Sequence, residues 1–275
     1  MSASHEPLVV TENRNGVAWI TMNRPKKLNA LSVELMGELS AALTAAEADD
    51  SIKVVVLRGT DAVFSVGYDI TQEVEMGVST AEQWHAGLEH NIGLSMQVWQ
   101  LKKPVIGAVS GWALAGGCEL AMACDIIIAS EEAKFGEPEI RFGSGPVTLL
   151  MPFLIGQKAT NELLFTGDVI DAERARELGM INRVVARAEL ERSVEKLAQT
   201  IALTPLTILR YTKRAITRAY NAMGLTSAVE SNHDIAAVLN SAYSEERTEF
   251  TRLVAEEGLV AALAWRDARY GGLED

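Results

Sequence analysis

Three short apolar runs, rich in β-branched residues, constrain the fold of this chain most strongly. They are Ile52–Leu57, Val105–Val109 and Ile126–Ala129. A continuous apolar strand of this kind is typical of burial on both faces of a sheet. A Gly-containing turn and a helix near Gly117–Ala123 separate the second run from the third. This alternation of strands and helices predicts an α/β architecture.

The N-terminal part of the chain predicts a hairpin followed by a helix. Two β-prone runs, Leu8–Thr11 and Val17–Met22, flank Asn13–Gly16, and an Asn-Gly pair strongly favours a tight turn between antiparallel strands. Ser32 is a residue type that caps helices. The leucines after it recur every four residues and predict one apolar stripe facing a core: Leu35, Leu39 and Leu43.

The C-terminal part of the chain changes character. A predicted helix begins at Asp171 and ends at Gly179, and a short strand follows at Asn182–Val185. Beyond Thr204 the patterns are helical, over Pro205–Tyr220, Thr226–Tyr243, Glu245–Ala255 and Leu259–Arg269. We therefore divide the chain into a core, residues 1–203, and a C-terminal helical region, residues 204–275. Within the core, Gln72–Gln97 has no sustained period and is interpreted as a loop that enters a helix.

Charge and composition disfavour several classes of protein. The 275 residues carry 25 basic and 37 acidic side chains, a net charge of −12, whereas a nucleic-acid-binding surface needs clustered positive charge. The apolar stretch Pro104–Ser130 is interrupted by Glu119 and Asp125, so it is a poor membrane span. Cys118 and Cys124 are too few for a disulfide scaffold or a zinc site. No secretory signal is visible, and we expect a cytoplasmic protein.

Two acidic residues and two Gly-containing turns are the candidates for chemistry. Glu119 lies in an otherwise apolar helix. Burial there would raise the pKa of its carboxyl toward the range useful in proton transfer, and the alternative is a wet face or a structural ion pair. Glu139 lies in Phe-Gly-Glu-Pro-Glu, where acids are commonly surface residues, and spacing alone does not bring it to Glu119. The turns Gly111–Gly117 and Phe64–Ile70 either expose backbone N–H groups or serve only tight packing.

Other familiar sites are not predicted. Gly111–Gly117 lacks the Lys and Ser or Thr of a P-loop and does not fit the spacing of a dinucleotide-binding turn. His85 and His90 have no carboxylate or Cys at ligand spacing, so we expect no metal. Ser110 stands one place too late for the G-x-S-x-G turn of serine hydrolases.

Five motifs, read in order between Gly16 and Val185, closely resemble the enoyl-CoA hydratase, or crotonase, superfamily. They are Asn23-Arg24-Pro25 with Asn29-Ala30-Leu31, FSVGYDI (64–70), KPVIGAVSGWALAGGCELAMACDIIIAS (103–130), AKFGEPEIRFG (133–143), and LFTGD (164–168) with DAERARELGMINRVV (171–185). The resemblance implies a spiral of repeated strand-strand-helix units. It further implies that residues 1–203 form an acyl-CoA-binding core and that residues 204–275 pack subunits into a homotrimer or a dimer of trimers.

The resemblance also implies which residues carry the reaction. The carbonyl oxygen of an acyl-CoA thioester would lie between the backbone N–H groups of Tyr68 and Gly116. Glu119 and Glu139 would share the acid–base work, and we assign Glu119 to the water and Glu139 to the proton at the α-carbon. The residues expected around the substrate and its CoA are Lys27, Leu28, Ala30, Ser65, Gly67, Asp69 and Ile70. Coenzyme A is part of the substrate, so no separate cofactor is expected.

The leading hypothesis is therefore an enoyl-CoA hydratase-like lyase. Hydration builds negative charge on the thioester oxygen, which preorganised N–H donors stabilise. An isomerase or an acyl-CoA thioester hydrolase on the same scaffold, and a non-catalytic binding protein, are the alternatives. Three positions depart from the pattern of the family. Tyr68 is bulkier than the small residue common there, Thr71 replaces a frequent Lys, and Gly143–Thr148 replaces a Gly-rich stretch near the acyl pocket.

Overall fold

A six-stranded sheet forms the centre of the molecule, in the order β1-β2-β3-β5-β7-β10. The computed structural model describes residues 6–60 and 62–271. β1 (Val9–Arg14) pairs antiparallel with β2 (Val17–Met22), and every later neighbour in this sheet is parallel. The remaining strands are β3 (Val54–Arg58), β5 (Val105–Val109), β7 (Ile126–Ser130) and β10 (Arg183–Val185).

A smaller sheet has the order β4-β6-β8-β9. Its strands are β4 (Val63–Ser65), β6 (Trp112–Leu114), β8 (Lys134–Gly136) and β9 (Val169–Asp171). Three times in succession the chain adds one strand to the large sheet and the next to the small sheet: β3 then β4, β5 then β6, and β7 then β8. A helical segment follows each pair. The expected spiral of strand-strand-helix units is therefore confirmed.

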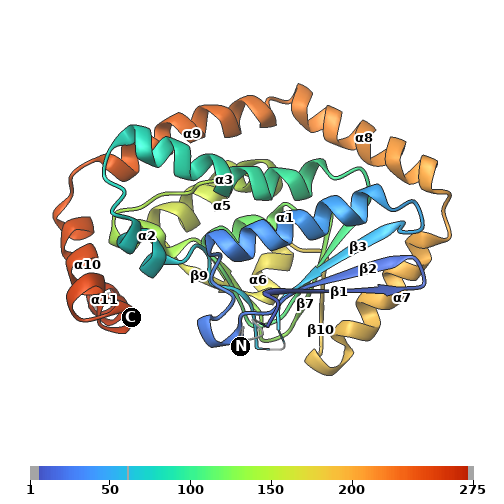
Figure 1. Cartoon of the computed structure of the whole chain (residues 1–275), viewed down its shortest axis with the longest axis horizontal. Coiled ribbons are helices and arrows are strands. Elements are labelled where there is room, and N and C mark those ends of the chain that lie inside the picture. Colours follow the sequence, from blue (N-terminus) through green and yellow to red (C-terminus); the bar gives the residue numbers. More distant parts are fainter. Residues whose placement is uncertain (1–5, 61, 272–275) are drawn as a thin grey trace, which may run out of the picture.

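Helices cover both faces of the large sheet (Figure 1). On one face, α1 (Val33–Ala48), α3 (Ala81–Gln100) and α4 (Gly116–Met122) bury the main core. On the other face, α7 (Leu190–Ala202) packs Val194 and Ala198 against Trp19 and its neighbours on the sheet. The other helices before residue 204 are α2 (Ile70–Met76), α5 (Met151–Thr166), α6 (Ala172–Glu177), η1 (Pro25–Lys27), η2 (Pro138–Phe142) and η3 (Arg187–Glu189).

Four helices form the C-terminal region, as predicted: α8 (Leu206–Ala222), α9 (Leu225–Ser241), α10 (Glu245–Glu256) and α11 (Leu259–Ala268). α9 runs beside α3, and α10 packs against α2 at the end of the molecule remote from α7 (Figure 1). Lys213 fastens α8 to the core, because its buried Nζ lies 2.7 Å from Asp125 Oδ2 and donates to the carbonyl of Lys103. Whether this region also joins subunits stays a prediction.

The predicted hairpin and the predicted helix cap near the N-terminus are both confirmed. Arg14 pairs with Val17 across a two-residue turn in which Asn15 and Gly16 both have positive φ, 53° and 81°, the geometry that an Asn-Gly hairpin requires. Ser32 caps α1, since its Oγ accepts a hydrogen bond from the amide of Leu35. The three leucines of the predicted stripe are fully buried: Leu35, Leu39 and Leu43.

The interpretation of Gln72–Gln97 as a loop that enters a helix is wrong, because two helices cover almost all of it. Gly77, with a φ of 64°, ends α2. A reciprocal capping box between Thr80 and Gln83 then begins α3. The buried residues of α3 include Trp84, Leu88 and Ile92, which recur every four residues. Polar residues between them, such as His85 and His90, made this apolar pattern difficult to recognise in the sequence. The small sheet was also missed, since three-residue strands are too short to show a period.

Three findings concern the cysteines, the apolarity of the helices and the grouping of possible metal ligands. Cys118 and Cys124 are both buried and both free thiols. Within residues 6–60 and 62–271, none of the helices combines the length and apolarity needed to cross a bilayer. The same residues contain no group of three or more His, Cys, Asp or Glu arranged to hold a metal ion.

Candidate active site

Two chain segments approach unusually closely where β4 and β6 end. A Cβ on Gly67, whose φ is 95°, would lie 2.8 Å from the Cβ of Ala115 and 3.1 Å from the amide nitrogen of Gly116. A Cβ on Gly117 would lie only 2.4 Å from the carbonyl oxygen of Ser65. Ala115 has a positive φ, 49°, which is costly for a residue with a side chain. These glycines therefore let two backbones meet, and the turn before α4 stores strain.

The amides of Tyr68 and Gly116 lie on these two segments. The carbonyl of Gly67 and the amide of Asp69 both bond to Leu31, and alternate N–H groups of an extended segment point to opposite sides. The amide of Tyr68 consequently faces away from Leu31. Among residues 6–60 and 62–271, neither it nor the amide of Gly116 donates a hydrogen bond to a described partner. Both predicted donors are thus available to a ligand oxygen.

Glu119 lies three residues into α4 and is fully buried. Its Oε1 accepts hydrogen bonds from the amides of Val147 and Thr148, each at 2.6 Å, and its Oε2 accepts one from the Tyr68 hydroxyl at 3.1 Å. Burial raises the pKa of Glu119 to about 6, because loss of water outweighs the three donors that favour the carboxylate. Glu119 is therefore neither on a wet face nor in an ion pair.

Glu139 is the second residue of the short helix η2 and is also buried, with 6% of its surface exposed. Its Oε2 has no hydrogen-bond partner among the described residues. Burial, together with the negative charge of Glu119, raises the pKa of Glu139 to about 8. The structure therefore brings the two acids into electrostatic contact, and their environments separate the two pKa values around neutral pH.

A third carboxyl, Glu137, is buried beside this pair. Burial and the charges of Glu119 and Glu139 raise its pKa well above the usual range. Its Oε2 also has no described partner. From its sequence context Glu137 was expected at the surface like Glu139, and the strand β8 before it is too short to have indicated that the chain ends there in the interior.

The loop 143–148, which supplies both amides to Glu119, is held by the C-terminal helices. Asn232 on α9 donates to the carbonyls of Pro146 and Val147, each at 3.0 Å. Arg247 on α10 donates to the carbonyl of Gly143, and Ser144 donates to Asn240 at 2.7 Å. Residues of the C-terminal region thus fix the donors of a buried carboxylate in the core.

A cavity of about 480 Å³ is lined by sequence neighbours of these groups, although Tyr68, Gly116, Glu119 and Glu139 do not line it themselves. Leu114, Val66 and Pro138 line it and directly neighbour the turn before α4, the Gly67–Tyr68 segment and Glu139. Lys134, Arg141 and Arg266 add positive charge to its wall. These three cations were not predicted from the sequence, although two of them, Lys134 and Arg141, lie within the AKFGEPEIRFG motif.

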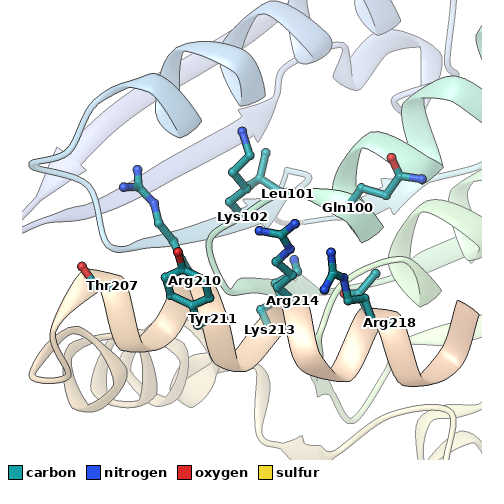
Figure 2. Close-up of a pocket in the computed structure, with 10 residues that line it drawn as sticks. Gln100, Leu101, Lys102, Thr207, Arg210, Tyr211, Lys213, Arg214 and Arg218 are labelled. Atoms are coloured by element: carbon teal, nitrogen blue, oxygen red, sulfur yellow. The ribbon is translucent and has the colours of Figure 1, made fainter.

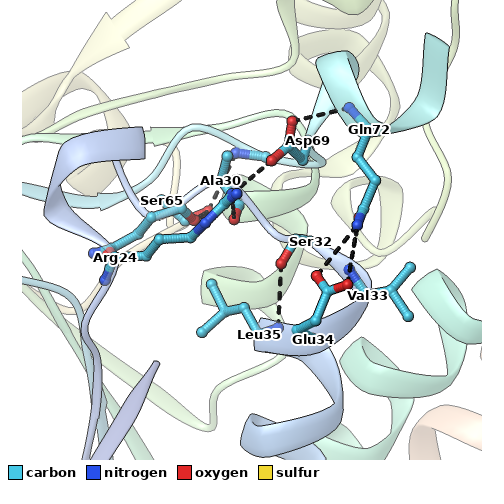
Figure 3. Close-up of polar contacts among 11 residues, drawn as sticks. Arg24, Ala30, Ser32, Val33, Glu34, Leu35, Ser65, Asp69 and Gln72 are labelled. Carbon is cyan, nitrogen blue, oxygen red and sulfur yellow. Dashed lines mark hydrogen bonds and ion pairs between the residues drawn. The ribbon is translucent and has the colours of Figure 1, made fainter. Parts of the chain in front are cut away.

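Of the residues predicted around the substrate, Leu28 lines this cavity, while several others shape the adjoining turn (Figure 3). Asp69 pairs with Arg24 at 2.6 Å and caps α2 through the amide of Gln72. Ser65 donates to the carbonyl of Asn29 and accepts from the amide of Gly67. The remaining three lie nearby: Lys27 is exposed in η1, the Ala30 carbonyl accepts from Arg24, and Ile70 packs against the cluster of α10 and α11. Their contact with CoA stays a prediction.

A separate cavity of about 610 Å³ lies along α8, beside Gln100–Lys102 (Figure 2). Its wall carries the cationic side chains of Lys102, Arg210, Arg214 and Arg218. None of the residues predicted to carry chemistry lines it. It is thus distinct from the carboxyl pair.

Comparison with known proteins gives a consistent result. The family model described as Enoyl-CoA hydratase/isomerase matches residues 12–256. A relative from Rhizobium meliloti (strain 1021), named Probable enoyl-CoA hydratase, is 37% identical over 276 residues, covering 97% of this chain and 98% of its own. The Crotonyl-CoA hydratase of Syntrophomonas wolfei is 36% identical, covering 75% and 80%. The crystal structure of an enoyl-CoA hydratase/isomerase from Xanthobacter autotrophicus Py2 superposes with a TM-score of 0.93 at 41% identity, covering 95% and 98%.

Proposed function

The chain belongs to the enoyl-CoA hydratase/isomerase family, and from this premise we propose that it hydrates the double bond of a 2-enoyl-CoA thioester with Glu119 and Glu139 as the acid–base pair. One observation carries the proposal. Two buried carboxyls, with pKa values raised to different extents, lie beside two backbone amides that have no described acceptor.

The geometry supports a division of roles between these groups. The thioester oxygen accepts hydrogen bonds from the amides of Tyr68 and Gly116, each of which typically lowers such a barrier by roughly 3–4 kcal/mol. Glu119, as the carboxylate, takes a proton from water, and the water oxygen bonds to the β-carbon. The π electrons move to the α-carbon, which receives the proton of Glu139. A proton exchange between the two carboxyls then restores the starting state.

In this proposal each positioned proton transfer contributes a factor of ~10²–10⁴. The carboxyls and amides supply the charge stabilisation and the proton transfers, so the proposed mechanism uses no separate cofactor or metal. The acyl-CoA thioester is the partner molecule.

A panel of 2-enoyl-CoA substrates with mass detection tests the function. Hydration adds one water to the intact thioester and removes the absorbance of the conjugated system. An isomerase would leave the mass unchanged, and a thioester hydrolase would release free CoA. Loss of absorbance with no gain of water, or no turnover across chain lengths and branching patterns, would contradict the hydratase assignment.

The pH dependence of kcat/KM is expected to be bell-shaped, with limbs near pH 6 and pH 8. The rate falls below about pH 6 because Glu119 becomes protonated and no longer accepts a proton from water. It falls above about pH 8 because Glu139 loses the proton that it must donate. The two limbs are properties of the coupled pair. Initial rates with crotonyl-CoA at constant ionic strength measure them, and a profile flat from pH 5 to 9 would refute these roles.

We further propose that the protein assembles as a homotrimer or a dimer of trimers through its C-terminal region. Large exposed apolar side chains favour an interface there, and they include Ile208, Tyr211, Ile216, Met223, Ile235 and Val238. Light scattering on the intact chain should give three or six times 29.8 kDa. The cytoplasmic location stays a prediction, which cell fractionation would test.

A further inference from the structure

The side chain of Tyr68 takes part in the site as well as its amide. Its ring lies over Gly116, where an added Cβ would be 2.5 Å from the ring atoms Cε2 and Cζ. Its hydroxyl donates to Glu119 Oε2 at 3.1 Å. One residue therefore contacts both halves of the proposed machinery, the oxyanion donors through its backbone and the water-activating carboxylate through its phenol.

The phenol donates a hydrogen bond to Oε2, the oxygen of Glu119 that we expect to accept a proton from water. Oε1 already accepts two short bonds from the amides of Val147 and Thr148. Oε2 is thus the oxygen left to face a reacting water, and Tyr68 is the side chain bonded to it. Burial and the charge of Glu119 raise the pKa of the phenol well above its usual value, so the hydroxyl remains a donor at every pH at which the enzyme would work.

We propose that the Tyr68 side chain is a positioning residue, which fixes Oε2 of Glu119 and keeps that carboxylate ionised for water activation. The inference deepens the proposed function and rests on it only for the catalytic consequence. A hydrogen bond to a charged oxygen favours the charged form. Without it, Glu119 would hold its proton to higher pH.

The other ionisable groups around Glu119 act in the opposite direction. The charge of Glu119 acts on Glu137 at the start of η2, on Glu139 within η2 and on Cys118 on α4 itself, so all three are electrostatically coupled to it. Negative charge on any of them disfavours the carboxylate form of Glu119. Arg266, on α11, acts on Glu139 and favours its ionisation. The phenol, the two amides and the side chain of Thr148 therefore favour the ionised form of Glu119 against these charges.

The Tyr68→Phe variant tests the inference, because it keeps the ring over Gly116 and removes only the hydroxyl. Carbon-13 NMR of labelled glutamate carboxyls follows the titration of Glu119, with E119Q identifying its resonance. We expect the midpoint of Glu119 to rise by about one pH unit, and the low-pH limb of kcat/KM to move with it. Tyr243→Phe, at an exposed site after α9, should change neither.

The two proposals fail in distinguishable ways. A Glu119 midpoint that is the same in Tyr68→Phe and wild type overturns the role of Tyr68, even if the wild type hydrates enoyl-CoA. If the Glu119 midpoint is higher in Tyr68→Phe than in the wild type, and the wild type does not hydrate any enoyl-CoA, the role of Tyr68 is supported and the hydratase assignment is overturned. Should Tyr68→Phe unfold, replacement of all tyrosines by 3-fluorotyrosine, a stronger donor, is expected to lower the midpoint, and an unchanged or raised midpoint counts against the inference.

Discussion

Replacement of Glu139 by glutamine is expected to lower kcat by about 10³-fold, within the ~10²–10⁴ range of a positioned proton transfer. The amide has nearly the shape of the carboxylic acid but cannot give a proton to the α-carbon. Glu119→Gln should lose a similar factor, because its amide cannot accept a proton from water. The double variant should lose less than the product of the two factors, since the groups act in one reaction. Stopped assays with crotonyl-CoA and thermal unfolding of each variant provide the measurements.

The third buried carboxyl offers a matched control. Glu137→Gln makes the same chemical change beside the same pair, in a residue with no assigned step, and we expect less than a tenfold loss of kcat. A loss in Glu137→Gln as large as that in Glu139→Gln, with both proteins folded, would show that the assignment of roles among the three acids is wrong. So would a Glu139→Gln variant within tenfold of the wild type.

Gly67→Ala is expected to reduce kcat by about 10²–10³-fold, the usual effect of losing an oxyanion donor. Its Cβ would lie 2.8 Å from the Cβ of Ala115 and 3.1 Å from the nitrogen of Gly116. The chain must move to relieve this contact, and the movement separates the amides of Tyr68 and Gly116 from a common oxygen. KM should change much less than kcat, because hydrogen bonds to a developing oxyanion strengthen mainly in the transition state. Steady-state kinetics on a 2-enoyl-CoA separates the two parameters.

The strain of a positive φ must be distinguished from this displacement. Gly77→Ala is the control, because Gly77 has a φ of 64° and no atom within 4 Å of an added Cβ. Both variants should lose stability, on the order of 1 kcal/mol, while only Gly67→Ala should lose most of its activity. Equal catalytic rates in the two variants would mean that these amides do not hold the thioester oxygen.

The large sheet was predictable because its signals are local. The apolar run Val105–Val109 forms β5 with the predicted bounds, and the Asn15-Gly16 turn sets the first hairpin. The small sheet was not, since β4, β6, β8 and β9 have three residues each and are held by pairing with distant segments. α3 escaped recognition because its buried Trp84 and Leu88 alternate with polar residues that face solvent.

Some features of the site could likewise be predicted from local motifs, and others could not. The motifs named Glu119, Glu139 and the two amides, and the structure places the Tyr68 side chain against Glu119 and Gly116 and couples Glu119 to Glu139. Their catalytic roles stay predictions. No pattern in the sequence indicated that the amides of Val147 and Thr148 bind Glu119, because those residues are 28 and 29 positions away. The same holds for Glu137 and for the Tyr68 hydroxyl, whose environments are created by tertiary packing rather than by neighbours in the chain.

The attachment of the loop 143–148 to α9 and α10 affects when during synthesis this protein becomes an enzyme. Asn232, Asn240 and Arg247 lie in the last 50 residues and leave the ribosome after both sheets have been made. A nascent chain, or one clipped before α9, would retain the strands and both glutamates but would lack the bonds from Asn232, Asn240 and Arg247 to the loop that carries Val147 and Thr148. We therefore expect such fragments to have a less ordered carboxylate site, and a catalytic rate well below that of a chain that includes α9 and α10.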